Sequence, residues 1–264
     1  MHEDIRFGIS KIDEIVKAHK VDIIVHFAAE SHVDNSIKSP NIFFETNVLG
    51  TVNLLNIAKD NNIRIHVIGT DEVYGMTWPN SDAHENYPLC PSSPYSSSKA
   101  SSDLIALSYF KTFGTKVTVS RCTNNFGPWQ HYEKLIPTVI SRALETKRIP
   151  VYGDGLQKRH WIHVDEHNEA LIKIIEDGEL GQIYNIAPLP ENYISNIDII
   201  KFILDELRKP YSLIEHVTDR LGHDTSYFLK DFKFQSKFGN AGKSLWKDRM
   251  KDTVKWYATH HATA

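Results

Sequence analysis

The chain has 264 residues, enough for one large domain or two small ones with a buried core. Hydrophobic residues make up 41% and charged residues 24%, which is ordinary for a folded protein and excludes a disordered, collagen-like or coiled-coil chain. Lysine and arginine number 30 against 33 for aspartate and glutamate, so the net charge of −3 gives no general attraction to nucleic acid or to an anionic membrane.

Two cysteines, Cys90 and Cys122, are too few for a disulfide framework and indicate a reducing compartment. The opening MHEDIRFG lacks the basic start and apolar run of a secretory signal, and no apolar stretch is long enough to span a bilayer. We therefore expect a cytoplasmic protein that neither crosses a membrane nor binds nucleic acid.

Short apolar runs alternate with helical periodicities along the first 150 residues. The nearly continuous apolar run from Val21 to Ala28 is typical of a strand covered on both faces, as in a parallel sheet. The expected helices are 9–19, 41–60, 94–113 and 134–145, and the expected strands are 21–28, 63–69 and 116–121. This alternation predicts an α/β fold with a Rossmann-like parallel sheet and flanking helices.

The pattern changes after Pro150, where GDGLQKR reads as a turn-rich loop. The segments expected beyond it are a short strand at 162–164, a helix at 165–177, a strand at 182–186 and helices at 195–208 and 247–260. Ser195 or Asn196 is suited to cap the first of these last two helices. We expect two domains, residues 1–150 and a smaller lobe of residues 151–264 interleaved with the first.

Tyr95 and Lys99 stand four residues apart in PYSSSK, which places them on one face of the expected helix. An ammonium beside a phenol stabilises the phenolate and lowers the pKa of the tyrosine from about 10. Tyr95 could then act as a base for a sugar hydroxyl. Taken alone, such a pair is more often a partly exposed pair on a helix surface.

Thr70, Asp71 and Glu72 follow an expected strand in GTDEVYG, at the sheet edge where open α/β folds bind their ligands. Two carboxyl groups buried near each other do not both ionise easily, so one could serve as an acid and the other as a base. The alternative is that both merely cap the turn after the strand.

Nine segments occur in an order that characterises one family. They are HFAAESHVDNSI, TNVLGT, GTDEVYG, SSPYSSSKASSD, RCTNNFGP, EKLIP, VYGDG, YNIA and DRLGHD. From Asp4 to TVKWY near residue 257, the chain resembles the dTDP-glucose 4,6-dehydratases of the extended short-chain dehydrogenase/reductase superfamily. The resemblance implies a cytoplasmic, homodimeric lyase of nucleotide-sugar metabolism and deoxysugar biosynthesis, with NAD as its cofactor.

The resemblance also implies a reaction. Tyr95, assisted by Lys99, would take the proton of the hexose 4-hydroxyl while NAD accepts the hydride from C4. Glu72 would remove the C5 proton and Asp71 would protonate the leaving 6-hydroxyl, after which the hydride returns to C6. Thr70 would hydrogen-bond the 4-oxygen. The product would be dTDP-4-keto-6-deoxyglucose.

Binding residues are implied by the same resemblance. Those expected at NAD, besides Tyr95 and Lys99, are Asp4, Ile5, Phe27, Ala28, Ala29, Glu30, Ser31, Thr46 and Asn125. Those expected at the nucleotide-sugar are Ser31, Thr70, Asn124, Lys134, Leu135, Pro150, Tyr152, Arg159, Asn196, Asp219, Arg220 and His223. Residues 1–150 would then be a partial NAD-binding domain, and residues 151–264 a nucleotide-sugar-binding lobe.

The chain departs from the family in one large respect, because it contains no Gly-rich phosphate turn of the G-x-x-G-x-x-G type. We therefore expect an N-terminally truncated member. No metal is expected, because His163 and His167 do not form an HExxH motif. The alternatives are another NAD-dependent nucleotide-sugar epimerase or dehydratase, and a non-catalytic remnant or binding subunit. Asp71 and Glu72 favour the dehydratase, because a 4-epimerisation eliminates nothing.

Overall fold

The computed structural model describes residues 3–260, and the chain forms two compact units. The first unit consists of Met1–Gly75, His84–Cys122 and Leu171–Asn185, and the second of Met76–Ala83, Thr123–Ala170 and Ile186–Ala264. Each unit thus combines three separate stretches of the chain. The division at residue 150 stays a prediction.

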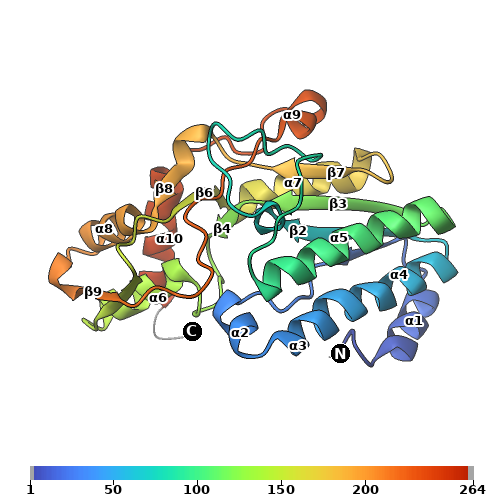
Figure 1. Ribbon diagram of the computed structural model, residues 1–264, viewed down its shortest axis with the longest axis horizontal. Helices are drawn as coiled ribbons and strands as arrows, with labels where there is room; N and C mark the ends of the chain where they lie inside the picture. Colours follow the sequence, from blue (N-terminus) through green and yellow to red (C-terminus); the bar gives the residue numbers. More distant parts are fainter. Residues whose placement is uncertain (1–2, 261–264) are drawn as a thin grey trace. The chain divides into compact units, whose positions relative to one another are not determined.

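A four-stranded sheet forms the centre of the first unit, in the order β1-β2-β3-β7 (Figure 1). Its strands are β1 (Ile23–His26), β2 (Arg64–Thr70), β3 (Lys116–Cys122) and β7 (Ile183–Ile186). β1 pairs with β2 and β2 with β3 in parallel. The predicted α/β class with a Rossmann-like parallel sheet is confirmed. Because the three strands are parallel, their carboxyl ends lie at one edge, where such folds bind ligands.

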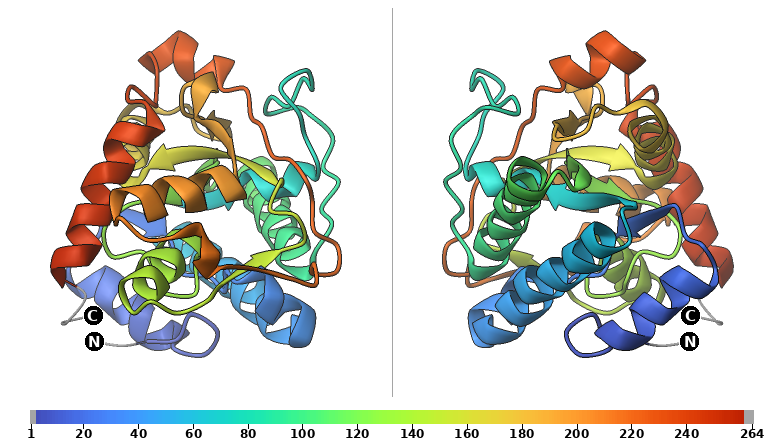
Figure 2. Two further views of the ribbon diagram at one scale, coloured as in Figure 1. Left: turned by 90° about the vertical axis from the view of Figure 1, so that its left-hand side faces the viewer. Right: turned by 90° about the vertical axis from the view of Figure 1, so that its right-hand side faces the viewer.

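The helices that lie wholly within the first unit pack with its sheet, and the first, fourth and fifth of them contribute side chains to one apolar core. They are α1 (Ile9–Ala18), α2 (Val33–Lys38), α3 (Pro40–Phe43), α4 (Gly50–Asp60) and α5 (Pro94–Phe113). Leu55, Ala58 and Ala106 from the helices and Ile65 and Val117 from the strands are fully buried in this core. α4 and α5 run side by side, as the two side views also show (Figure 2).

The single helix expected over 41–60 is wrong in its first half, because the wider π-helical turn η1 (Phe44–Leu49) separates α3 from α4. Asn47 lies inside η1 and is buried. Its amide nitrogen donates to the Glu30 carbonyl at 3.0 Å and to Ser98 Oγ at 2.8 Å, while its Oδ1 accepts from the Glu30 N–H at 2.8 Å. The Asn47 side chain thus connects η1 to the segment after β1 and to α5. Single π-helical turns of this kind are often found near functional sites.

The helix expected over 94–113 is confirmed as α5, and its boundaries have clear causes. Ser93 and Ser96 form a reciprocal capping box at the start, and Pro94 occupies the first turn. Gly114 ends the helix with a φ of 69°, a left-handed conformation that glycine adopts without strain. The helix packs closely on the sheet at Gly69, where an added Cβ would lie 3.1 Å from Asp103 Oδ1 of the helix. The same Cβ would lie 2.5 Å from the carbonyl oxygen of Ser120 on the neighbouring strand.

The second unit contains two small sheets and a helical layer. β4 (Asn124–Phe126), β6 (Lys158–His163) and β8 (Tyr193–Ser195) form one sheet, and β5 (Ile149–Tyr152) and β9 (Ile214–Val217) the other. Its helices are α6 (Leu135–Leu144), α8 (Asn196–Glu206), α9 (Phe232–Phe238) and α10 (Trp246–His260), while α7 (Val164–Asp177) is divided between the units. Ser195 caps α8 as expected, accepting from the Asp198 N–H.

Two further properties bear on the location of the chain. Among residues 3–260, no helix combines the length and the apolar character needed to cross a bilayer. Cys90 and Cys122 are both free thiols.

Three buried histidines should make the fold sensitive to acid. Burial lowers the pKa of His26 to about 3 and the pKa values of His160 and His167 to about 4, because an imidazolium is poorly solvated there. In the unfolded chain these groups protonate near pH 6.5, so the unfolded state binds more protons below that pH. We expect the free energy of unfolding to fall between pH 7 and pH 5, by about 2 kcal/mol for each histidine.

Urea unfolding at the two pH values measures this loss. The variant His167→Gln should flatten the pH dependence, whereas His19→Gln, at an exposed position, should leave it unchanged. Equal stability of the unsubstituted chain at pH 7 and pH 5 would contradict the prediction.

Candidate active site

A short 3-10 turn, η2 (Asp71–Tyr74), follows β2 directly and carries the two acidic residues. Thr70 Oγ1 accepts from the Glu72 N–H at 3.3 Å and donates to Asp71 Oδ1 at 3.1 Å. Gly75 ends the turn with a φ of 67°. Asp71 is buried and Glu72 is half-buried, so both carboxyl groups are fixed at the carboxyl edge of the parallel sheet.

Tyr95 lies in the first turn of α5 and is buried. Burial raises the pKa of Tyr95 well above its usual value, and the nearby Glu72 and Cys122 raise it further, while a hydrogen bond with Thr70 lowers it. The pKa lowering expected from the sequence is therefore wrong for the structure as described, because desolvation of the phenolate outweighs the favourable contacts. The hydrogen bond nevertheless brings the Tyr95 hydroxyl to the residue that begins the acidic turn.

Lys99 follows Tyr95 by one helical turn and is also buried. Its Nζ donates to the Ile68 carbonyl of β2 at 2.5 Å. Burial lowers the pKa of Lys99, and the negative charges of Asp103 and Cys122 act to raise it. Lys99 thus brings a buried ammonium group to the helix face that carries Tyr95.

The first unit therefore gathers all five residues that the sequence analysis assigned to catalysis: Thr70, Asp71, Glu72, Tyr95 and Lys99. The arrangement supplies a phenol, an ammonium group, a hydroxyl and two carboxyl groups. Such a set can move protons between several positions of one substrate. The individual roles of these residues stay predictions.

Most of the residues expected at NAD lie around the carboxyl end of β1. Phe27 and Ala28 are exposed there, and the next residues, Ala29 and Glu30, are half-buried. The backbone of Glu30 is held at both its N–H and its carbonyl by the side chain of Asn47. An exposed segment fixed at this edge, with Ser31 exposed and Thr46 half-buried, fits the wall of a dinucleotide site.

Asp4 and Ile5, expected near the adenine, are held against α4 in the same unit. Arg6 donates to both carboxylate oxygens of Asp4 and lowers the pKa of Asp4 to about 2. The Ile5 carbonyl accepts from Asn53, and an added Cβ at Gly50 would clash with the Ile5 side chain at 2.5 Å. Asn125, expected beside Lys99 at NAD, belongs to the second unit.

The second unit brings together several of the residues expected at the nucleotide. β5 and β9 run in parallel with Tyr152 opposite Val217, so the segment from Asp219 to His223 follows the strand beside Tyr152. His223 Nδ1 is 2.6 Å from Asp219 Oδ1, and the rings of Tyr152 and His223 meet edge-on at 6.2 Å. Burial lowers the pKa of His223, as do the charges of Arg220 and Arg159. The cluster so formed contains two arginines, two aromatic rings and one carboxylate: Arg159, Arg220, Tyr152, His223 and Asp219.

Arg159 in this cluster is held rigidly. Its guanidinium donates to the Lys158 carbonyl at 2.9 Å and to the Asp224 carbonyl at 2.8 Å, and it stacks 4.4 Å from the centre of the Tyr227 ring. The side chain is 5% exposed. An arginine fixed in this way is preorganised for a bidentate contact with a phosphate.

The other expected nucleotide-sugar residues of the second unit lie at the ends of short elements. Lys134 and Leu135 begin α6, Pro150 lies in β5 and Asn196 begins α8. Asn124 begins β4, and its Oδ1 is buried without a hydrogen-bond partner in the described structure. A buried acceptor without a partner is costly, so a ligand donor would stabilise it.

Sequence reasoning missed several residues that surround the catalytic set: Asn47, Tyr74, Asp103 and Arg121. Asp103 had a visible signal, because Tyr95, Lys99 and Asp103 follow one another at intervals of four on a single helix face. The other three become recognisable only through their contacts. Within residues 3–260, no group of three or more His, Cys, Asp or Glu side chains is arranged to hold a metal ion.

Comparisons with known proteins agree with this fold. The model of the NAD dependent epimerase/dehydratase family matches residues 6–187. The dTDP-glucose 4,6-dehydratase of Mycolicibacterium smegmatis is 40% identical over 244 residues, which cover 91% of this chain and 73% of that protein. The corresponding enzyme of Streptomyces antibioticus is 42% identical over 92% of this chain and 72% of its own length.

Solved structures give the same result. A dTDP-glucose 4,6-dehydratase of Streptomyces venezuelae with NAD and TYD bound superposes with a TM-score of 0.94 at 39% identity, over 99% of this chain and 80% of that one. A UDP-glucose 4-epimerase of Thermus thermophilus, at 22% identity and a TM-score of 0.89, shares the fold. The chain belongs to the NAD dependent epimerase/dehydratase family.

Proposed function

We propose that the chain is an NAD-dependent lyase that removes water from dTDP-glucose and forms dTDP-4-keto-6-deoxyglucose. One observation carries this proposal: the turn that holds Asp71 and Glu72 begins at Thr70, which hydrogen-bonds Tyr95. A base for alcohol oxidation and an acid–base pair for elimination are thus adjacent. Relatives about 40% identical to the chain bear the name of this activity.

The residues around β1 fit NAD, because an exposed segment fixed by Asn47 lies at the carboxyl edge of the sheet. Bound there, NAD would supply the acceptor for the hydride of C4 and the donor to C6. We assign Phe27, Ala28, Ala29, Glu30, Ser31 and Thr46 to its wall, Asp4 and Ile5 to the adenine region, and Tyr95, Lys99 and Asn125 to the reacting end.

Tyr95 accepts the proton of the hexose 4-hydroxyl in the first step. Burial makes its phenolate costly, and the hydrogen bond with Thr70 offsets part of this cost. We assign Lys99, on the same helix face, as the ammonium group that assists the proton transfer. Thr70, bonded to Tyr95, also hydrogen-bonds the 4-oxygen. The 4-ketone then makes the C5 proton acidic.

Glu72 and Asp71 perform the elimination. The half-exposed Glu72 accepts the C5 proton, and the buried Asp71, in its protonated form, donates a proton to the 6-hydroxyl, which leaves as water. The C5–H and C6–O bonds break as the C5–C6 double bond forms. Two carboxyl groups in opposite protonation states are what this step requires.

The second unit carries the groups suited to the nucleotide diphosphate. We assign Arg159 and Arg220 to the phosphates, Tyr152 to the base, and Lys134 as a further positive charge. Asn124, Leu135, Pro150, Asn196, Asp219 and His223 complete this set, with Ser31 and Thr70 from the first unit. The unpartnered Oδ1 of Asn124 and the preorganised Arg159 support the assignment.

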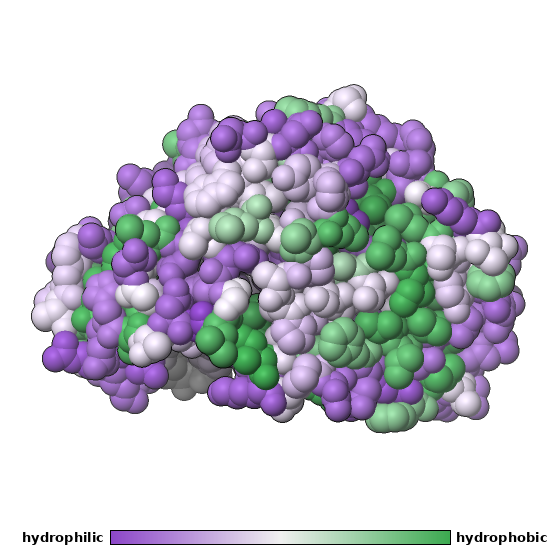
Figure 3. Space-filling view, in the orientation of Figure 1, coloured by the Kyte–Doolittle hydropathy of each residue, from purple (hydrophilic) through white to green (hydrophobic). Residues whose placement is uncertain are grey.

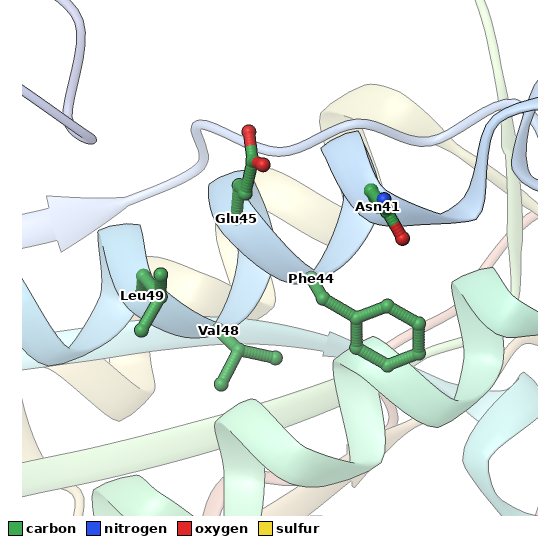
Figure 4. Close-up of a pocket in the computed structure, with 5 residues that line it drawn as sticks. All are labelled: Asn41, Phe44, Glu45, Val48 and Leu49. Carbon is green, nitrogen blue, oxygen red and sulfur yellow. The ribbon is translucent and has the colours of Figure 1, made fainter.

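The chain forms a homodimer through the outer face of η1 and α5, in our proposal. Apolar side chains gather over α4 and α5 (Figure 3), and Phe44, Leu49, Leu104 and Phe113 are each at least 40% exposed. A hollow of about 350 Å³ lies along η1, where Phe44 and Val48 project to one side (Figure 4). Lys99 and Asp103 of α5 are buried, so Lys111 is the one charged residue of this helix outside the core. A second copy of the chain could therefore cover the face while burying few charges.

A cytoplasmic location is part of the same proposal. The two free thiols, Cys90 and Cys122, are compatible with a reducing compartment and support this location.

Incubation of the chain with NAD and dTDP-glucose, followed by mass spectrometry of the nucleotide-sugar, tests the function. We expect the loss of one water. Tyr95→Phe should reduce product formation by roughly 10²- to 10⁴-fold, since it removes the base for the first step. Tyr109→Phe, a half-buried tyrosine farther along α5, is the control. Unchanged mass with the unsubstituted chain would refute the proposed activity.

Glu72→Gln should separate the two chemical steps. The variant keeps Tyr95 and Lys99, so the hexose should be oxidised at C4 but should keep its 6-hydroxyl. Reduction of the quenched mixture with borodeuteride and mass spectrometry would detect a hexose labelled at C4. Absence of this species, with nucleotide-sugar binding intact, would contradict the role assigned to Glu72.

Leu104→Glu should dissociate the dimer, because it places a charge in the centre of the apolar face. Light scattering after size-exclusion chromatography measures the mass. Leu245→Glu, at a similarly exposed leucine of the second unit, should leave the mass unchanged. A monomeric unsubstituted chain at micromolar concentration would rule the dimer out.

A further inference from the structure

A buried ion pair lies behind the catalytic residues in the first unit. Arg121 of β3 donates through Nε to Asp103 Oδ2 of α5 at 2.8 Å, and the two side chains are 2% and 0% exposed. Asp103 follows Lys99 by one helical turn and Tyr95 by two. The ion pair therefore contacts α5 on the helix face that carries Tyr95 and Lys99.

The same guanidinium also holds the acidic turn. Arg121 Nη1 donates to the Tyr74 hydroxyl at 2.8 Å and to the Glu85 carbonyl at 3.3 Å, and the guanidinium lies 4.8 Å from the centre of the Tyr74 ring. The Tyr74 hydroxyl donates in turn to Asn185 Oδ1 at 2.8 Å, and the Asn185 N–H donates to Glu85 Oε1 at 2.9 Å. Every link in this network lies within one unit.

Tyr74 is the last residue of η2, the turn whose first two residues are Asp71 and Glu72. A turn of four residues has little freedom to move at one end while the other end is fixed. The chain Asp103–Arg121–Tyr74 thus connects the helix of Tyr95 and Lys99 to the turn of Asp71 and Glu72. Thr70 provides a second connection at the start of the turn.

The stability gained from such a network is small. Burying two charges costs about as much as their attraction returns, so apolar residues of similar volume could serve the core equally well. What the ion pair and its hydrogen bonds supply is a defined geometry. Carboxyl groups that exchange protons with a substrate need that geometry, since small misplacements cost rate steeply.

We propose that Tyr74 and Arg121 are positioning residues that fix Asp71 and Glu72 relative to Tyr95 and Lys99, and that elimination depends on them more than C4 oxidation does. The inference rests on the proposed function. Oxidation uses Tyr95 and Lys99 of α5, and Lys99 is already bonded to the Ile68 carbonyl of β2. Elimination uses two carboxyl groups carried by the turn.

Tyr74→Phe is the decisive variant, because it keeps the ring over Arg121 and removes only the hydroxyl. Tyr184→Phe is its matched control: Tyr184 is equally buried in the same unit, and its hydroxyl accepts from the Glu179 N–H at 2.9 Å, away from the acidic turn. The readout is the ratio of 4-keto hexose that retains its 6-hydroxyl, trapped with borodeuteride, to 6-deoxy product.

We expect Tyr74→Phe to raise this ratio by roughly tenfold or more and to lower kcat with little change in KM. Tyr184→Phe should behave as the unsubstituted chain. Arg121→Lys, which keeps the charge but loses the forked geometry, should shift the ratio in the same direction. A ratio unchanged in both Tyr74→Phe and Arg121→Lys would overturn the inference, as would an equal shift in Tyr184→Phe.

Hydrogen–deuterium exchange of the amides of residues 71–75 gives a result that does not depend on turnover. Faster exchange in Tyr74→Phe than in Tyr184→Phe is expected, and equal exchange would overturn the positioning role. If the unsubstituted chain forms no product, the proposed function fails, while this exchange comparison still decides whether Tyr74 fixes the turn.

Discussion

The close approach of α5 to the sheet at Gly69 is the constraint on which the site of the first unit depends. A side chain at this position would lie 3.1 Å from Asp103 Oδ1 of α5, and 2.5 Å from the Ser120 carbonyl oxygen of the neighbouring strand β3. Without it, the helix lies near enough for Lys99 to donate to the Ile68 carbonyl and for Tyr95 to bond Thr70. A glycine weakens a central strand because it costs backbone entropy and offers no side chain to pack. Here the missing side chain allows the helix and the end of the strand to lie close together.

Burial explains the chemistry of this site as well as its geometry. Tyr95, Lys99, Asp71 and Asp103 all lie out of water, where an isolated charge is unfavourable. Burial accordingly raises the pKa of Tyr95 and lowers that of Lys99, so both groups are drawn toward their neutral forms. A neutral Tyr95 must gain a favourable partner for its phenolate before it can accept a proton.

The second unit contains polar side chains that are held in place by their neighbours. Arg159 is fixed by two backbone carbonyls and an aromatic ring, and His223 is fixed by Asp219. These side chains have lost their rotational freedom before any ligand arrives, which lowers the entropic cost of binding an anionic nucleotide. The first unit therefore holds groups that can transfer protons, and the second holds groups suited to binding an anionic ligand.

The sequence by itself determined the fold class and the limits of α5, because apolar strand runs and helical periodicity are local patterns. It also placed Thr70 to Glu72 at the end of a strand, and Tyr95 and Lys99 on one helix face, because their spacing is local. The ordered motifs likewise indicated the family. Tertiary structure decided the rest. The π-turn η1 contains Asn47, whose bonds to Glu30 and Ser98 join segments distant in the chain. The short strands of the second unit likewise depend on distant partners. The pKa of Tyr95 was predicted in the wrong direction because burial, the dominant influence, has no local signature. Tyr74 and Arg121 were missed for the same reason, since their contacts join residues 47 positions apart.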